Sequence, residues 1–186
     1  MALDANKDQD EYYTADGGED IKRDVAAGGE PFIPPVKALV NRAPAISVYN
    51  YWQLNKRKVA AQNKYLRRWV ESDPRPDILL MPTMPHTAVL HRSCRWVGYT
   101  KVWNFLDYTA LVMPAGKVDK ALDPRETDPD VKDYKPRNDL DRSNWALYDL
   151  EKMHNLPVSI QLVGRRLEEE KVLGASKVID AMINLQ

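Results

Sequence analysis

Two histidines and the single cysteine of this chain lie within a nine-residue stretch, at His86, His91 and Cys94. Imidazole nitrogens and a thiolate are zinc ligands, and a cysteine beside a histidine can act as a nucleophile with a general base. The spacing matches no common zinc signature, and no fourth ligand is near because His154 is remote in the sequence. We therefore interpret the three as ordinary loop residues and expect no metal, with zinc binding and a Cys–His pair as the alternatives.

The serines and glycines give no catalytic pattern. The serines are scattered along the chain: Ser47, Ser72, Ser93, Ser143, Ser159 and Ser176. None lies in a G-x-S-x-G elbow, and no glycine-rich loop is present to form an oxyanion hole or hold phosphate. The stretch GEDIKRDVAAGGE at residues 18–30 has the spacing of neither a dinucleotide-binding turn nor a P-loop. It predicts a turn and a helix cap, and we expect no cofactor.

Composition indicates a globular protein with no affinity for polyanions. The 186 residues are 44% hydrophobic and 29% charged, with a formal net charge of zero, which suits one ordinary domain. A basic helix face from Lys56 to Arg68 could contact nucleic acid or anionic lipid, but a solvated face fits the zero net charge better. The N-terminus lacks the basic and apolar regions of a signal peptide, and a lone cysteine fits a reducing compartment. We expect a cytoplasmic protein that binds neither nucleic acid nor a membrane.

The first third of the chain predicts a frayed start and one long helix. Residues 1–14 are polar and are expected to be frayed or disordered. A helix is predicted from Ser47, as N-cap, to about Val70. Mostly apolar residues recur there at helical spacing: Val48, Trp52, Asn55, Val59, Gln62, Leu66 and Trp69. The sequence DPRP at residues 73–76 ends this helix.

Three short apolar runs predict strands. Residues 77–82 (DILLMP) and 110–114 (ALVMP) are unalternated and close with proline, a pattern typical of parallel strands buried on both faces. Residues 157–164 alternate, which places Val158, Ile160 and Leu162 on one face and Ser159 and Gln161 on the other.

The remainder predicts a long loop and a final helix. Residues 119–144 are rich in Asp, Pro, Lys and Arg without periodicity, so we expect a long surface loop. A helix is predicted from about Leu167 to Leu185, with one apolar face formed by Val172, Ala175, Ile179, Met182 and Ile183. Strands separated by helices indicate an α/β fold, and we expect a single segment over residues 1–186.

An ordered series of motifs carries a resemblance to a known family. The series comprises ADGGED (15–20), GEP (29–31), YWQLN (51–55), DILLMPTMP (77–85), YTKVWNFLDYTALVMPAGKVD (99–119), YKPRN (134–138), YD (148–149) and PVSIQLVGRRLEEEKVL (157–173). In this order the motifs resemble the C-terminal half of a fungal acetamidase-type enzyme of the amidase signature family. Two positions depart from the family pattern: Ser159 stands where glycine is frequent and Thr109 where proline is frequent.

The resemblance implies a fold and an activity, but no catalytic residue in this chain. The family hydrolyses carboxylic amides with two serines and a lysine that lie in its N-terminal half, and no position here matches them. The family's C-terminal portion implies a partial mixed β-sheet flanked by helices and part of the substrate wall. Met84, Trp103 and Asn104, in or beside MPTMP and WNFLD, are the candidate wall residues.

Two hypotheses follow from the resemblance. In the first, the chain is a truncated amidase homologue that is inactive alone and meets a small amide substrate only with the missing half. In the second, it is a non-catalytic interaction or regulatory protein that pairs with a full-length amidase or self-associates through an unpaired sheet edge.

Overall fold

The computed structural model describes residues 10–125, 131 and 133–184, which form two compact units. The first unit comprises residues up to Pro76 together with Lys101–Tyr108, and the second comprises Asp77–Thr100 and the chain from Thr109 onward. The chain passes between the two units three times.

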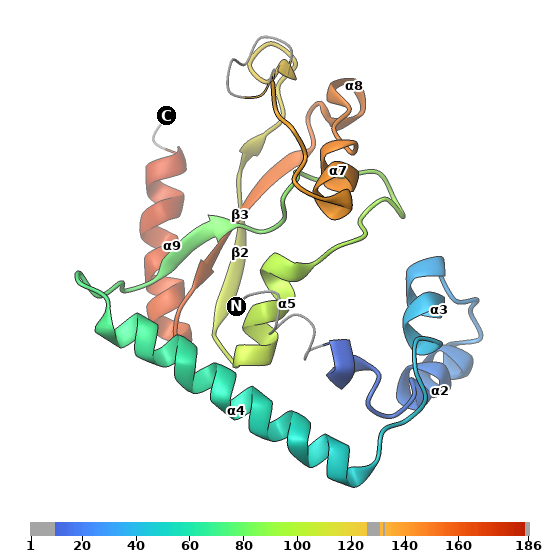
Figure 1. The fold of residues 1–186 in the computed structure, drawn as a ribbon. Coiled ribbons are helices and arrows are strands. Elements are labelled where there is room, and N and C mark those ends of the chain that lie inside the picture. The colour runs from blue at the N-terminus through green and yellow to red at the C-terminus, as the bar shows by residue number, and fades with distance from the viewer. Residues whose placement is uncertain (1–9, 126–130, 132, 185–186) are drawn as a thin grey trace. The chain divides into compact units, whose positions relative to one another are not determined.

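The first unit is helical and is organised along one long helix. Besides a short helical turn at residues 10–13, it contains α2 (Glu19–Gly28), α3 (Pro34–Val40), α4 (Val48–Glu71) and most of α5 (Gly98–Leu106) (Figure 1). The predicted cap of α4 is confirmed, because the backbone N–H of Asn50 donates to Ser47 Oγ at 3.2 Å. Leu54 and Trp69 are the buried residues of α4. The rest of the predicted apolar stripe is largely exposed, including Trp52 at 60%.

The start of the described chain is attached to the first unit. Residues 1–9 of the segment expected to be frayed lie outside the described residues, and residues 10–13 are helical. Lys101, which is buried, contacts Asp10 with its Nζ 2.5 Å from Oδ1. The ring of Tyr12 meets Phe105 edge-on with centroids 5.8 Å apart, and its hydroxyl donates to Asn55. Residues 10–14 thus carry specific contacts.

The second unit contains a three-stranded sheet in the order β1-β3-β2. The strands are β1 (Leu79–Pro82), β2 (Ala110–Lys117) and β3 (Pro157–Val163), so the three predicted strands are confirmed. Both outer strands pair antiparallel with β3, so the expectation of parallel neighbours buried on both faces is wrong. Antiparallel sheets can leave side chains in water, and Leu80 and Val112 are 56% and 53% exposed.

Helix α9 (Glu169–Asn184) closes the core of the second unit by packing on β2 and β3. Met113, Leu162 and Val172 form the buried cluster. Partly buried side chains pack around this cluster: Ile78, Leu111, Ile160, Ala175, Ile179 and Ile183. The predicted apolar face of α9 is therefore confirmed except at Met182, which is 65% exposed. The alternation of β3 is also confirmed, since Leu162 faces α9 while Gln161 lies on the opposite face.

The excursion between β2 and β3 is partly helical. Residues 126–130 and 132 of the predicted loop lie outside the described residues, and α7 (Asp139–Trp145) and α8 (Leu150–Met153) follow. The guanidinium of Arg125 lies 3.8 Å from the ring centroid of Trp145 and donates to its carbonyl oxygen at 2.7 Å. Tyr134 stacks on the same ring at 4.2 Å. These contacts join the beginning and end of the excursion.

Candidate functional site

A buried glutamine links two segments of the second unit, the end of β1 and the first turn of α5. Gln161, on β3, is 1% exposed. Its side-chain Nε2 donates to the carbonyl oxygen of Pro82 at 3.1 Å and to that of Tyr99 at 3.0 Å. Pro82 ends β1 and Tyr99 lies in the first turn of α5. One amide group, at low dielectric where hydrogen bonds are strong, therefore joins the end of β1 to the beginning of α5.

Met84 lies two residues beyond β1 in the second unit and is half-buried. Its neighbours carry two buried polar atoms, Thr83 Oγ1 and His86 Nε2, that have no hydrogen-bond partner among the described residues. His86 Nδ1 lies 2.7 Å from the carbonyl oxygen of Thr87. Because a carbonyl only accepts, Nδ1 carries the proton of this contact.

Trp103 and Asn104 lie on the part of α5 that belongs to the first unit. Trp103 is buried at 6% exposure and meets Tyr65 edge-on, with ring centroids 6.3 Å apart. Burial raises the pKa of the Tyr65 hydroxyl. The indole Nε1 of Trp103 has no acceptor among the described residues, whereas Asn104 is exposed. Trp103 thus offers a buried N–H donor and Asn104 an accessible amide.

The three candidate wall residues are distributed over two units. Met84 belongs to the second unit, and Trp103 and Asn104 are adjacent residues of the first. Their assembly into a single wall therefore stays a prediction.

Four of the six serines use their hydroxyls in local structure. Ser47 caps α4, while Ser72, Ser143 and Ser176 donate to carbonyl oxygens of Arg68, Asp139 and Leu173 at 2.5, 2.8 and 2.9 Å. Each of these acceptors lies three or four residues earlier, as is usual for serine at a helix. Such hydroxyls are positioned by the backbone and not by a general base.

The histidine–cysteine stretch shows no metal geometry. Cys94 Sγ lies 3.8 Å from the carbonyl oxygen of Trp96. Over residues 10–125, 131 and 133–184, no three side chains from His, Cys, Asp and Glu lie together as metal ligands. The same part of the chain has no helix long and apolar enough to cross a membrane.

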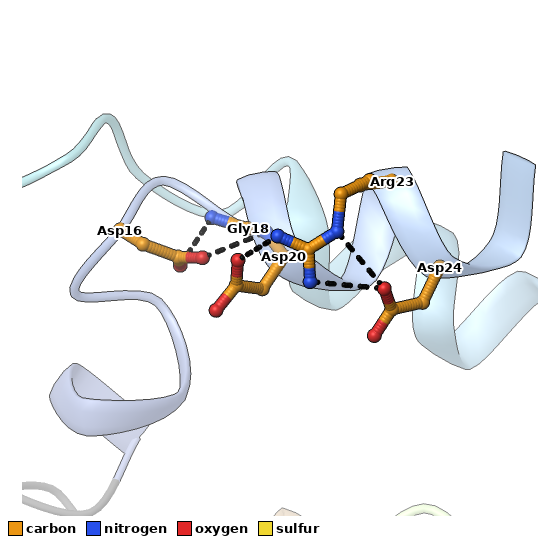
Figure 2. Close-up of polar contacts among 5 residues, drawn as sticks. All are labelled: Asp16, Gly18, Asp20, Arg23 and Asp24. Atoms are coloured by element: carbon orange, nitrogen blue, oxygen red, sulfur yellow. Dashed lines mark hydrogen bonds and ion pairs between the residues drawn. The ribbon is translucent and has the colours of Figure 1, made fainter. Parts of the chain in front are cut away.

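The glycine turn before α2 is closed by its own polar groups (Figure 2). Asp16 accepts from the backbone N–H of Gly18 at 2.8 Å and from that of Asp20 at 2.9 Å. These two N–H groups, that of Asp20 first, lower the pKa of the Asp16 carboxyl. Arg23 donates to Asp20 and Asp24 on α2, and Gly29 ends that helix in a left-handed conformation. The predicted turn and helix cap are confirmed.

A small cavity in the second unit was not predicted. Its volume is about 220 Å³, and residues from three segments line it, including Ser93, Tyr148, Asp149 and Lys152. Asp149 contacts Lys152 Nζ at 2.5 Å and accepts from the Lys152 backbone N–H at 3.1 Å. These contacts with Lys152 lower the pKa of the Asp149 carboxyl. Asp149 and Lys152 thus neutralise each other at the cavity. The cavity was not predicted because its lining comes from separate segments, which share no sequence motif.

Comparison with known proteins agrees with the resemblance read from the motifs. The model of the family described as Amidase matches residues 2–173. The chain is 55% identical over 187 residues to Amidase 1 of Gibberella moniliformis, covering 98% of this chain and 35% of that protein. It is 36% identical over 176 residues to the acetamidase of Aspergillus oryzae, covering 92% of this chain and 31% of that protein.

A solved structure gives the same result at the level of the fold. A fatty acid amide hydrolase superposes with a TM-score of 0.86 at 25% sequence identity, over 98% of this chain and 32% of that one. The α/β class of the amidase signature fold is therefore confirmed. This chain belongs to the amidase family. It spans about a third of the length of the curated relatives that it matches.

Proposed function

We propose that this chain supplies part of the substrate wall of an amide-hydrolysing site and does not hydrolyse amides by itself. The observation that carries the proposal is its match to amidases over nearly its whole length but only about a third of theirs. The hydrogen bonds of four serine hydroxyls support the proposal. None of the four bonds to a lysine or histidine among the described residues: Ser47, Ser72, Ser143 and Ser176.

In the proposed wall, Met84 provides apolar contact and Trp103 and Asn104 provide polar groups. A buried donor without an acceptor costs a protein about 1–3 kcal/mol. The indole N–H of Trp103 is such a donor among the described residues. In the proposed wall, the carbonyl oxygen of a small amide accepts its hydrogen bond. Gln161 supports the segment of Met84 by donating to the carbonyl oxygen of Pro82, two residues earlier. No cofactor has a role in this proposal.

The test is an assay of the purified chain on acetamide and on aryl amides. We expect no turnover above the buffer rate. Turnover from this chain alone, abolished by a serine-directed inhibitor, would falsify the proposal. Isothermal titration calorimetry with acetamide tests the role of the indole N–H. It compares the wild type with Trp103→Phe, each in a complex with an amidase portion that restores turnover.

A second candidate function is a non-catalytic interaction protein that pairs with an amidase. The observation that favours it is the exposure of β1, where Leu80 is 56% exposed and β3 is the sole neighbour among the described residues. Co-purification with a full-length amidase, without any change in the turnover of that amidase, would favour this function over the first. We place either function in the cytoplasm, which the single cysteine supports.

A further inference from the structure

A carboxylate at the start of the described chain lies between two cations from distant elements of the first unit. Asp10 Oδ1 is 2.5 Å from Lys101 Nζ on α5, and Asp10 Oδ2 is 3.2 Å from Arg42 Nη1, just after α3. All three residues belong to the first unit. Each oxygen of this one carboxylate is therefore held by a different basic side chain.

The two cations differ in their access to water. The side chain of Lys101 is 9% exposed, whereas the side chains of Arg42 and Asp10 are 52% and 35% exposed. The site thus has a buried ammonium on its inner side and an accessible guanidinium on its outer side. Because a buried charge is costly unless an opposite charge compensates it, Lys101 requires an anion at this position.

One carboxylate does not neutralise the two cations. Among the described residues, Asp10 is the one acidic side chain in contact with Lys101 or Arg42. An ammonium and a guanidinium together carry more N–H donors than one carboxylate can accept. The site therefore keeps a net positive charge and spare donors while Asp10 is bound.

Asp10 belongs to a short segment that tertiary contacts hold in place. Residues 10–13 form a single helical turn, and isolated helices of fewer than about 12 residues are marginal in water. The Tyr12 ring meets Phe105 edge-on at 5.8 Å, and Thr14 Oγ1 donates to the carbonyl oxygen of Asp10 at 3.1 Å. Terminal segments open locally at a lower free energy than the whole fold, so Asp10 can leave the site while α3 and α5 stay folded.

We propose that Lys101 and Arg42 form a binding site for a small carboxylic acid, and that Asp10 is the chain's own competing ligand. The Asp10 carboxylate shows which chemical group the two cations accept. A free carboxylate enters from the exposed side of Arg42, replaces Asp10 on Lys101 and releases residues 10–13. Because Asp10 is tethered beside the site, its effective concentration there is high. The ligand therefore binds the native chain weakly and binds a chain without this carboxylate more tightly.

The test is a titration of the full chain with sodium acetate at constant ionic strength, in which acetate replaces chloride. Chemical shifts of the backbone amides in NMR spectra give the dissociation constant and locate the ligand. We expect weak binding to the wild type, with shifts at Arg42 and Lys101. Amides of residues 10–13 should exchange faster with deuterated water as acetate is added, because the ligand displaces the turn.

The variants separate the competing carboxylate from the cations. Asp10→Asn removes the competing charge, and we expect it to bind acetate at least tenfold more tightly than the wild type. Asp24→Asn is the matched control, because Asp24 pairs with the exposed Arg23 on α2, and its affinity should equal that of the wild type. Arg42→Gln should weaken binding at least tenfold in either background, since it removes the guanidinium. Thermal melts show that each variant folds.

Every outcome decides for or against the site. Tighter binding by Asp10→Asn, weaker binding by Arg42→Gln and faster exchange of residues 10–13 in the wild type support it. Equal affinities of Asp10→Asn and Asp24→Asn, or shifts confined to other residues, overturn it. If Asp10→Asn does not fold, the wild type and Arg42→Gln decide alone.

Two further results would overturn the proposal. The first is a wild type that binds no acetate or keeps the exchange of residues 10–13 unchanged, because Asp10 is then not displaced. The second is binding of inorganic phosphate at least tenfold more tightly than acetate, because the cations would then serve a phosphate group. The proposal does not depend on the proposed function, since Met84, Trp103 and Asn104 take no part in it.

Discussion

The turn at residues 16–24 and the strand end at residues 79–86 differ in how their polar and apolar groups are satisfied. In the turn, Asp16 and Arg23 find their partners within eight residues, and the segment is complete by itself. At the strand end, Thr83 and His86 carry buried polar atoms without partners among the described residues, next to the exposed Leu80. The turn therefore satisfies its own hydrogen bonds, whereas the strand end keeps two buried polar atoms that the described residues do not satisfy.

The largest expected effect is a difference between the two leucines of one ladder pair. Leu162→Ala removes a fully buried side chain and should lower the free energy of unfolding by about 2–5 kcal/mol. Leu80→Ala should cost less than about 1 kcal/mol because its side chain is already largely in water. Urea unfolding of both variants measures the two values. If Leu80→Ala costs as much as Leu162→Ala, then β1 is covered in the free chain and the comparison fails.

A glycine substitution tests how closely the turn is packed. Gly18 has φ +77°, and a Cβ there would lie 2.8 Å from Val40 Cα, so Gly18→Ala should cost about 1–3 kcal/mol. Gly29→Ala is the matched control, because Gly29 has φ +67° but a Cβ added there would have no atom within 4 Å. Thermal unfolding should show the larger loss at Gly18. Equal losses would mean that backbone conformation, and not contact with Val40, limits the turn.

Removal of a hydroxyl tests the unsatisfied strand end. Thr83→Val replaces a hydroxyl without a partner among the described residues by a methyl group, and stability should stay the same or rise by up to about 1 kcal/mol. Thr109→Val should instead destabilise, because Thr109 Oγ1 donates to Glu169 at 3.1 Å. Chemical denaturation of Thr83→Val and Thr109→Val measures both changes in stability. Comparable destabilisation by the two variants would show that the Thr83 hydroxyl already has a partner in the free chain.

The smallest expected effect is the pH dependence contributed by Asp16. Its pKa is lowered in the folded chain by the N–H groups of Asp20 and Gly18, so its ionised form stabilises the fold. That contribution is present above the unfolded value of 3.8 and is lost as the pH falls through the lower folded value. The difference in melting temperature between the wild type and Asp16→Asn should therefore shrink from pH 7 to pH 2.

The control for this pH effect is Asp24→Asn, whose carboxylate accepts only from the neighbouring Arg23 in the close-up of the turn (Figure 2). We expect it to change the melting temperature less than Asp16→Asn at pH 7. A difference for Asp16→Asn that persists at pH 2 would mean that the side chain acts through shape and not through charge.

Sequence reasoning located the elements because their signals are local. Ser47 followed by residues at helical spacing identified α4, and the alternation in β3 placed Leu162 and Gln161 on opposite faces. The direction of strand pairing was wrong, since an apolar run such as that of β1 reports hydrophobic character and not the direction of its neighbour.

Features that join distant segments were out of reach of the sequence. Gln161 was placed on its face of β3, but its bonds to Pro82 and Tyr99 span 79 and 62 residues. A glutamine between the apolar residues Ile160 and Leu162 was the available signal, because a polar side chain in a buried part of a strand requires partners. The cavity beside Ser93 and Lys152 had no comparable signal, since its lining comes from three segments.

The central position of β3 has a consequence for synthesis on the ribosome. Among the described residues, β1 and β2 each pair with β3 alone, yet β3 is the last of the three to be made. At about 5–20 residues per second, β1 waits roughly 4–15 s for its partner. During that interval its apolar edge is open to chaperones or to other nascent chains. A ribosome that pauses before Pro157 therefore holds two strands that cannot yet form a sheet.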